Sequence, residues 1–318
     1  MKTQLTAPPI KQKKQTKWQQ TANRVWKERY LLLIGLPGVL YFLVYKYTPM
    51  AGSYLAFVDF NPFQGIFHSE WVGMAHFQRI FEDQEVFRVI MNTLYISFLQ
   101  IIFAFPLPIV LALMLNELRN QTYKKVLQSI VYLPHFLSWV VVVGISIVFL
   151  KSEGIINTLL HDMFGWNAIP FLTNPDYFKP VVVLQVIWKE AGWGTIIFLA
   201  ALSGVNPQLY EAANMDGAGR LRQIWNITLP AIRSTIVILL ILRLGQVMDS
   251  GFEHIFLMLN PLNQDTQNVL DTFVYFKGIQ QSDYSFATAV GLFKGIVGLF
   301  LVVTANKLAK KFGEEGVY

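Results

Sequence analysis

Six long apolar stretches, separated by polar segments, are the main pattern along this sequence. They lie at residues 30–47, within 89–116, and at 126–150, 180–202, 229–248 and 286–306. An α-helix needs about 20 apolar residues to cross a bilayer, and each stretch is near that length. The pattern predicts an all-α integral membrane protein with six transmembrane helices.

The composition agrees with a membrane location and narrows the chemistry. Hydrophobic residues make up 53% of the chain and charged residues only 14%, whereas soluble domains carry about 25% charged residues. The absence of cysteine excludes disulfides, thiolate catalysis and cysteine-ligated metals. The five histidines are scattered and form no metal-ligand spacing, so we expect no metal site.

The first 29 residues are polar and basic, and we expect them to form a cytoplasmic segment. Their first half has the composition of a disordered chain, whereas Trp18, Val25, Trp26 and Tyr30 predict an interfacial helix on an anionic leaflet. A signal peptide is disfavoured, because this lead is too long and no clear cleavage site follows. Residues 30–308 should form the transmembrane domain, and residues 309–318 a cytoplasmic tail.

The distribution of lysine and arginine predicts the orientation in the membrane. With the N-terminus in the cytoplasm, seventeen basic residues fall on the cytoplasmic side and six on the outer side. By the positive-inside rule both termini are therefore cytoplasmic. The net charge of +6 then reflects topology and not nucleic-acid binding. The long outer segments, residues 48–87, 151–179 and 250–285, could form a short cap at the outer mouth.

A polar stretch at residues 206–230 separates the fourth and fifth apolar segments. Asn206 is a good N-cap and Pro207 suits the first helical position, which predicts a helix that continues to Met215. Gly217 should end this helix with a positive φ, because glycine adopts left-handed dihedrals without a side-chain clash. A second short helix is predicted at residues 218–227.

This stretch resembles the EAA loop in the permease subunits of ATP-binding-cassette (ABC) importers. The motif is Glu-Ala-Ala, two free residues, Asp-Gly-Ala, an apolar–aromatic pair, Ile and Leu-Pro. Its positions here are Glu211, Ala212, Ala213, Asp216, Gly217, Ala218, Ile224, Trp225, Ile227, Leu229 and Pro230. Many members carry phenylalanine where this chain has Ile224, and the change stays apolar.

Less specific motifs extend the resemblance over nearly the whole chain, toward permeases for complex saccharides. They are Thr48-Pro49-Met50, Trp71-Val72-Gly73, Asn92-Thr93 and Phe312-Gly313-Glu314. The resemblance implies a MetI-like permease fold of the maltose-type importer family, nearest its oligosaccharide branch. It also implies a bacterial cytoplasmic membrane location and import by alternating access.

The partners that the resemblance implies are a second permease subunit, two ABC ATPase subunits, an extracellular or periplasmic solute-binding protein, membrane lipid and an oligosaccharide substrate. In that family the first helix of the EAA loop docks into a groove on the ATPase. Glu211, Ala212, Ala213, Asp216, Gly217 and Ala218 would thus couple the two proteins. ATP and magnesium would be bound by the ATPase, and this chain would hold no cofactor.

Enzyme motifs are absent from the sequence. It contains no Gly-x-Ser-x-Gly elbow and no phosphate-binding loop, so we expect no catalytic residue and no ATP site in this chain. A secondary transporter or channel for a polar solute is the competing class. That class would show paired repeats or broken helices in matching halves and would not need an EAA loop. A membrane enzyme is a third, disfavoured class.

Charged residues inside the apolar stretches mark candidate chemistry. Lys189, Glu190, Arg243 and Lys294 would each cost about 2.5–3.5 kcal/mol at the centre of a lipid-facing helix, so they should face protein or a wet cavity. Arg243, Gln246 and Ser250 follow at helical spacing with Asp249 beside them, which predicts one polar stripe. Two interpretations stay open: a substrate pathway, or a structural role as interhelix ion pairs or as membrane-edge residues near Lys189 and Asp249. The predicted pathway residues are Gln185, Trp188, Glu190, Arg243, Gln246 and Asp249.

Overall fold

A computed structural model of the chain describes Trp18 and residues 25–314 and 316–317. The predicted disordered segment and residues 19–24 of the predicted interfacial helix lie outside the described residues. The chain divides into two compact units, Met1–Tyr54 and Leu55–Tyr318. Of the described elements, all but a two-stranded hairpin are helical. This confirms the predicted all-α class.

The first unit is one long apolar helical rod. It consists of α2 (Arg29–Phe42), a π-helical turn η1 (Leu43–Tyr47) and α3 (Thr48–Met50), and it leads into the 3₁₀ helix η2 (Ala51–Phe57). The Thr48 hydroxyl donates to the carbonyl of Leu43 at 2.8 Å, beside Pro49, which has no N–H to donate. The rod is long and apolar enough to cross a membrane, as predicted for the first span.

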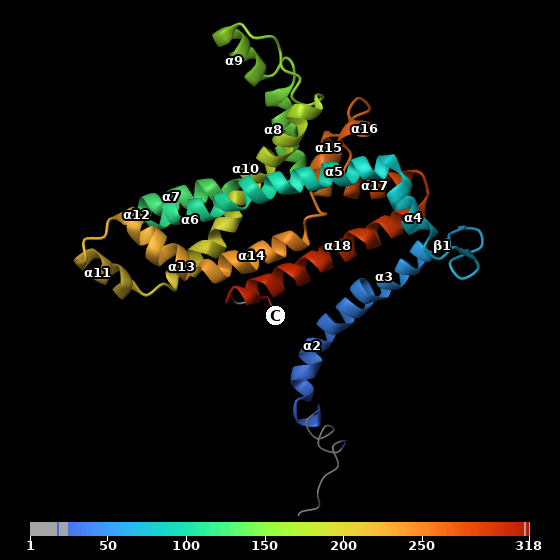
Figure 1. Ribbon diagram of the computed structural model, residues 1–318, viewed down its shortest axis with the longest axis horizontal. Coiled ribbons are helices and arrows are strands. Elements are labelled where there is room, and N and C mark those ends of the chain that lie inside the picture. The colour runs from blue at the N-terminus through green and yellow to red at the C-terminus, as the bar shows by residue number, and fades with distance from the viewer. Residues whose placement is uncertain (1–17, 19–24, 315, 318) are drawn as a thin grey trace, which may run out of the picture. The chain divides into compact units, whose positions relative to one another are not determined.

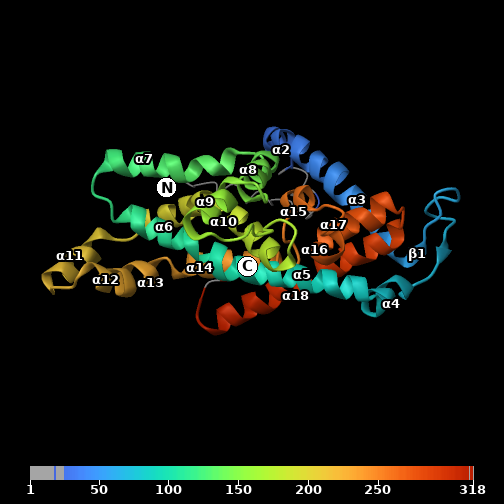
Figure 2. The ribbon, with the colours of Figure 1, turned by 90° about the horizontal axis from the view of Figure 1, so that it is seen from above.

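The second unit is a bundle of helices (Figures 1 and 2). Its elements before residue 140 are β1 (Val58–Asp59), β2 (Glu70–Trp71), α4 (Ala75–Glu82), α5 (Gln84–Leu99), η3 (Gln100–Ala104), α6 (Pro106–Asn116), α7 (Gln121–Tyr132), η4 (Leu133–Phe136) and the start of α8 (Trp139–Leu150). The later elements are α9 (Ile155–Phe164), α10 (Pro175–Ser203), α11 (Pro207–Met215), α12 (Arg220–Gln223), η5 (Ile224–Thr228), α13 (Leu229–Ala231), α14 (Arg233–Gly245), α15 (Phe252–Met258), α16 (Gln264–Gln267), α17 (Leu270–Tyr275), η6 (Phe276–Gln280) and α18 (Tyr284–Lys311).

The second predicted span is continuous but contains a π-helical turn. Helices α5, η3 and α6 run without a break from Gln84 to Asn116. Pro106 begins α6 and has no N–H to donate. Directly before it, the Phe105 N–H donates to the carbonyl of Gln100, five residues back, at 2.9 Å. The wide turn therefore accommodates the proline inside the apolar run.

The prediction of one continuous helix at residues 126–150 is wrong. Helix α7 ends at Tyr132, a 3₁₀ turn follows, and α8 begins only at Trp139. Pro134 lacks an N–H and crowds the preceding turn, which ends the helix. The backbone is extended at Leu137 (ψ 140°), and the Ser138 hydroxyl caps α8 by accepting the Val141 N–H at 3.4 Å.

The fourth and sixth spans agree with prediction, whereas the fifth differs. Helix α10 and helix α18 are both long and apolar enough to cross a membrane. The fifth span is a pair of segments, Arg220–Ala231 and Arg233–Gly245, bent by 61° at Ile232. The bend follows Pro230, and α14 ends three residues before the predicted boundary at Met248. The described residues thus hold five candidate spans, or six with the bent pair.

Three buried clusters hold the second unit together. The first joins α5, α17 and α18 around Phe273 and Phe286, and the second joins α8, α10 and α15 around Phe178. The third joins α6 and α10 to Ile232 at the bend. Asn92 and Thr93 attach α5 to the segment before α17. The Asn92 amide donates to the Thr266 and Asn268 carbonyls at 2.9 and 3.0 Å, and the Thr93 hydroxyl accepts the Leu270 N–H at 2.9 Å.

Different elements lie at the two ends of the bundle. The hairpin, in which Val58 pairs with Trp71, and α4 lie at one end, and α11 and α12 lie at the opposite end (Figures 1 and 2). After α18 the chain folds back onto this helix, and the Val317 N–H donates to the Asn306 side-chain oxygen at 2.7 Å. Glu314 then pairs with Arg233 at 2.6 Å, which joins the tail to the bend in the fifth span.

Candidate functional site

The loop with the EAA motif is a helix, a turn and a second short helix. Helix α11 covers Pro207–Met215, as predicted, and the Asn206 side chain caps it by accepting the Gln208 N–H at 3.0 Å. None of its residues is buried. Glu211, Ala212 and Ala213 therefore lie on a capped helix that is accessible at the end of the bundle (Figure 1).

Gly217 reverses the chain after α11 with a φ of +74°, the left-handed conformation expected from the sequence. The Ala218 N–H reaches back to the Ala213 carbonyl at 2.8 Å, and the Gly217 N–H reaches the Asn214 carbonyl at 3.1 Å. These bonds satisfy carbonyls that would otherwise be unpaired at the helix end. The second helix begins at Arg220, not at Ala218, because the residues between still belong to the turn.

Side chains that the sequence analysis did not single out hold this loop in shape. The Gln223 amide donates to the Asn214 side chain at 2.7 Å and to the Ala218 carbonyl at 2.8 Å. The Tyr210 hydroxyl is 3.0 Å from the Thr228 hydroxyl, which ties α11 to the turn before α13. Arg220 forms an ion pair with Glu117 at the end of α6. The loop is thus fixed both internally and to the bundle.

The loop also presents large apolar side chains to its surroundings. Met215 is 88% exposed, Leu221 74% and Trp225 70%. Large exposed apolar side chains that form a contiguous patch on a protein often mark a binding surface for a partner. Trp225 occupies the aromatic position of the EAA motif, so part of this surface could be recognised in the sequence.

The predicted pathway residues do not form one site. Glu190, Arg243 and Gln246 line a cavity of about 390 Å³ between η3, α6, α10 and α14. Gln185 and Trp188 line a different cavity, of about 400 Å³, between α8 and α10. Asp249 lies beyond the end of α14 and lines neither cavity. The predicted stripe that continues through Ser250 is therefore wrong, because the helix ends at Gly245.

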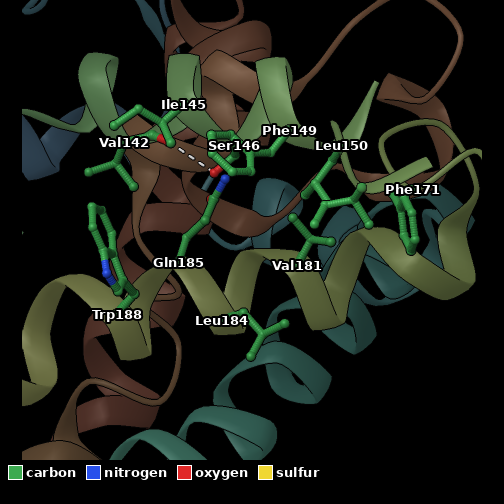
Figure 3. A pocket seen from close by; sticks show the side chains of 11 residues that line it. Val142, Ile145, Ser146, Phe149, Leu150, Phe171, Val181, Leu184, Gln185 and Trp188 are labelled. Atoms are coloured by element: carbon green, nitrogen blue, oxygen red, sulfur yellow. Dashed lines mark hydrogen bonds between the residues drawn. The ribbon is translucent and has the colours of Figure 1, made fainter. Parts of the chain in front are cut away.

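The cavity beside α8 is almost entirely apolar (Figure 3). Gln185 points from α10 toward Ser146 on α8, and Trp188 stands one turn along α10. The Ser146 hydroxyl donates to the Val142 carbonyl at 2.9 Å. Gln185 is only 5% exposed, and neither polar atom of its amide has a hydrogen-bond partner among the described residues.

Lys189 and Glu190 have structural partners at the break between α7 and α8. Lys189 is 6% exposed, and its ammonium donates to the carbonyls of His135 and Leu137 at 2.6 and 2.8 Å. These carbonyls lie where Pro134 interrupts the helix. Glu190 pairs with His135 Nδ1 at 2.8 Å, and the His135 ring stacks on Trp193 with centroids 4.5 Å apart. Lys189 therefore has a structural role as the donor to this break, and its ammonium also lies 3.7 Å from the carboxylate of its sequence neighbour Glu190.

Lys294 also has partners. It pairs with Asp249 at 3.3 Å and with Asp271. Burial raises the pKa of Asp271, and the bond from Lys294 opposes that rise. Asp249 is thus one side of an ion cluster that joins the end of the fifth span to the sixth. Gln246, in contrast, is exposed toward the first cavity.

Arg243 differs from the other charged residues in the spans. Its guanidinium donates to the Gln100 side-chain oxygen, and no carboxylate within the described residues lies within 4.0 Å of it. Gln100 was not among the predicted site residues. A signal was present, because it is a polar residue in the middle of an uncharged span.

His254 is a buried, neutral residue between α14 and α17. Its ring stacks on Trp139 with centroids 4.3 Å apart, and its Nε2 has no partner among the described residues. Burial lowers its pKa from 6.5 to about 4. Within the described part of the chain no three histidine, aspartate or glutamate residues are grouped as metal ligands.

Comparisons with known proteins place the chain in a family. Residues 104–312 match the family described as the binding-protein-dependent transport system inner membrane component. The polygalacturonan/rhamnogalacturonan transport system permease protein YteP of Bacillus subtilis (strain 168) is 52% identical over 306 residues, which cover 96% of this chain and 95% of YteP. Protein LplB of the same organism is 49% identical over 313 residues, 98% of this chain and 97% of LplB.

A solved structure matches both fold and sequence. It is a chain of a bacterial alginate ABC transporter in complex with an alginate pentasaccharide-bound periplasmic protein. The TM-score is 0.85 at 40% identity, over 93% of this chain and 99% of that one. The predicted MetI-like fold and the resemblance to sugar importer permeases are thereby confirmed. This chain belongs to the binding-protein-dependent inner membrane transport components and is a non-catalytic ABC permease subunit.

Proposed function

We propose that this chain is a permease subunit of an ATP-driven importer that carries oligosaccharides across the bacterial cytoplasmic membrane by alternating access. The names of two matched proteins refer to polygalacturonan, rhamnogalacturonan and alginate. These are acidic polysaccharides, so we further propose short oligosaccharides of this kind as the substrate class. An extracellular or periplasmic solute-binding protein delivers the sugar to the outer mouth.

The observation that carries the proposal is the prearranged loop at the end of the bundle. Glu211, Ala212 and Ala213 lie on an accessible helix, and small side chains permit close approach of a partner. Met215, the last residue of this helix, and Trp225, in the second half of the loop, add exposed apolar side chains. We assign this surface to an ABC ATPase. Asp216, Gly217 and Ala218 form the turn that sets the direction of the helix.

The remaining partners are the ones that the family of binding-protein-dependent transport components suggests. The sequence has no phosphate-binding loop, so ATP and magnesium belong to the ATPase subunits. Two ATPases and a second permease subunit, in a heterodimer with this chain, complete the assembly. ATP binding closes the ATPases, and the loop transmits this motion to the spanning helices.

The orientation that this proposal needs is the one given by the basic residues. Seventeen basic residues on the cytoplasmic side, against six on the outer side, support a cytoplasmic location for both termini and for the EAA loop. A reporter fused after Tyr318 that functions only in the cytoplasm should be active. Activity of an exported reporter at the same position would reverse the topology.

Purification of the tagged chain from its native membrane tests the assembly. We expect mass spectrometry to identify an ABC ATPase and a second permease in the same complex. In proteoliposomes, ATP-dependent uptake of an oligosaccharide should require all subunits and the binding protein. Uptake by this polypeptide alone, driven by an ion gradient, would instead establish a secondary transporter and overturn the proposal.

A further inference from the structure

Arg243 is held in place by a neutral side chain. It lies near the end of α14, and its guanidinium donates to the Gln100 side-chain oxygen on η3. A charged side chain within the hydrocarbon region is costly, and it normally pairs with an opposite charge or marks a pathway. Among the described residues no carboxylate pairs with Arg243. Asp249, on the same segment, is bound to Lys294 at 3.3 Å.

The cavity beside Arg243 has a mostly apolar lining with a few polar side chains, which is the usual make-up of a ligand site. Its volume of about 390 Å³ is within the range of about 300–1,000 Å³ that is typical of small-molecule sites. Gln100, Glu190, Trp193, Arg243 and Gln246 contribute to its lining. An aromatic ring, two amides and a guanidinium are the groups that a sugar acid would need: a flat surface for the ring and donors for hydroxyls and carboxylate.

Glu190 is the one acidic residue in this lining, and its charge is partly compensated by neighbouring side chains. Its carboxylate accepts from His135 at 2.8 Å and lies 3.7 Å from the Lys189 ammonium. It is therefore partly compensated on the α10 side of the cavity. Arg243, on the α14 side, retains guanidinium donors that Gln100 does not occupy, since a guanidinium has five N–H groups.

We propose that Arg243, oriented by Gln100, binds the carboxylate of a sugar acid during passage and is the residue that selects acidic over neutral oligosaccharides. The inference rests on the proposed function, because it assumes that the cavity belongs to the sugar pathway. The guanidinium is planar and always charged, which suits a two-point contact with a carboxylate. Gln100 fixes the plane of the guanidinium and leaves most of its N–H donors available to the substrate, while Asp249 acts on Arg243 only through the electrostatic field, without a direct ion pair.

The test compares a trisaccharide of galacturonic acid with its methyl ester, which keeps the rings and removes the charges. Uptake is measured in proteoliposomes that contain the whole transporter and its binding protein. Arg243→Gln should lower uptake of the acid about ten- to a hundredfold, as for a lost charge-assisted hydrogen bond, and should change ester uptake less than about threefold. Arg243→Lys should retain an intermediate preference, because the charge stays but the fork geometry is lost.

A second variant tests the same idea without removing the arginine. Gln100→Glu is nearly isosteric and places a carboxylate against Arg243, so it should abolish the preference for the acid while the complex still assembles. Arg88→Gln is the matched control, because it removes an exposed arginine from the span that carries Gln100. Its ratio of acid to ester uptake should equal that of the wild type.

The outcomes separate the two proposals. If the wild-type transporter takes up neither saccharide, the proposed function fails. If the wild type imports the acid, and both Arg243→Gln and Gln100→Glu keep the wild-type ratio of acid to ester uptake, the transporter stands and the assignment of Arg243 is refuted.

Discussion

The Gly217 turn permits a sharp test of the coupling role proposed for the EAA loop. Gly217 has a φ of +74°, and a Cβ added there would meet no atom within 4 Å. A substitution therefore causes no clash with neighbouring residues, and its cost is the backbone strain alone. For a β-branched residue in the left-handed region this strain is about 1–3 kcal/mol. Since about 1.4 kcal/mol corresponds to a factor of ten, the native turn should lose about five- to 150-fold in relative population.

The neighbouring Gly219 offers a matched control. It is equally free of close atoms, but its backbone is extended, with φ −70° and ψ 164°, which any residue adopts. Gly219 is the N-cap of α12, where threonine is about as favourable as glycine. Threonine is β-branched, so Gly217→Thr and Gly219→Thr compare the same side chain in strained and relaxed positions. Gly217→Asn is a third variant, because asparagine tolerates the left-handed conformation.

The assay measures three quantities for each variant: the amount of permease in the membrane, the ATPase retained on pull-down, and ATP-dependent uptake. All variants should insert, because the turn lies outside the spanning helices. Gly217→Thr should lower ATPase retention and uptake at least about fivefold, from the strain estimate above. Gly217→Asn should have a smaller effect, and Gly219→Thr should match wild type. Equal retention and uptake in the two threonine variants would refute the role of this turn.

Two further predictions concern buried polar groups. Lys189→Met should destabilise the purified chain by about 2–4 kcal/mol, because the carbonyls of His135 and Leu137 lose their donor. Lys151→Met, at an exposed lysine, is the control and should leave stability unchanged. An equal loss of thermal stability in both variants would contradict the role of Lys189 as the donor to these carbonyls. His254 has a native pKa near 4 and an unfolded pKa of 6.5, so the unfolded state binds the extra proton between these values. Stability should therefore fall by roughly 3 kcal/mol as the pH drops from about 6.5 to about 4. Thermal unfolding against pH measures this, and His254→Phe should flatten the profile; an unchanged slope would exclude His254 as its source.

Local signals in the sequence were sufficient for the loop and for most spans. The cap at Asn206, Pro207 at the first helical position and the glycine at residue 217 act within a few residues, so α11 and its turn could be placed without tertiary information. The break after Tyr132 was missed, although Pro134 was visible, because residues 126–150 contain no lysine, arginine, aspartate or glutamate and are mostly apolar on both sides of the break. Hydrophobicity reports burial in the membrane and not whether the helix within it is continuous.

The grouping of pathway residues failed for a geometric reason. Residues on a helix advance by about 100° each, so Trp188 and Glu190 point to nearly opposite sides of α10. Trp188 faces α8, and Glu190 faces the cavity beside α14. Which helix packs against which side of α10 depends on the tertiary structure and cannot be read from the helical periodicity of one sequence. Gln100 escaped notice for the same reason, because its importance lies in its contact with a helix far along the chain.

The fifth span contains both the second half of the EAA loop, from Arg220 onward, and the proposed selectivity residue Arg243. Helices α12 and α13 continue through the 61° bend at Ile232 into α14, which carries Arg243. Arg243 follows Ile232 by eleven residues, about 16 Å at 1.5 Å per residue. A rotation of about 10° at the bend would therefore move its backbone by about 3 Å, enough to break the contact with Gln100.

The same bend is tied to the C-terminal tail. Arg233, the first residue of α14, pairs with Glu314 at 2.6 Å, and Ile232 itself is buried in the cluster with Phe198 and Leu202 of α10. A motion that begins at α11 must therefore either carry α10 and the tail with it or release the pair. Because Gln100 belongs to η3 and Arg243 to α14, such a motion of the EAA loop would change the distance between these two residues, and with it the proposed binding site for the substrate carboxylate. Coupling and selectivity would then share one hinge.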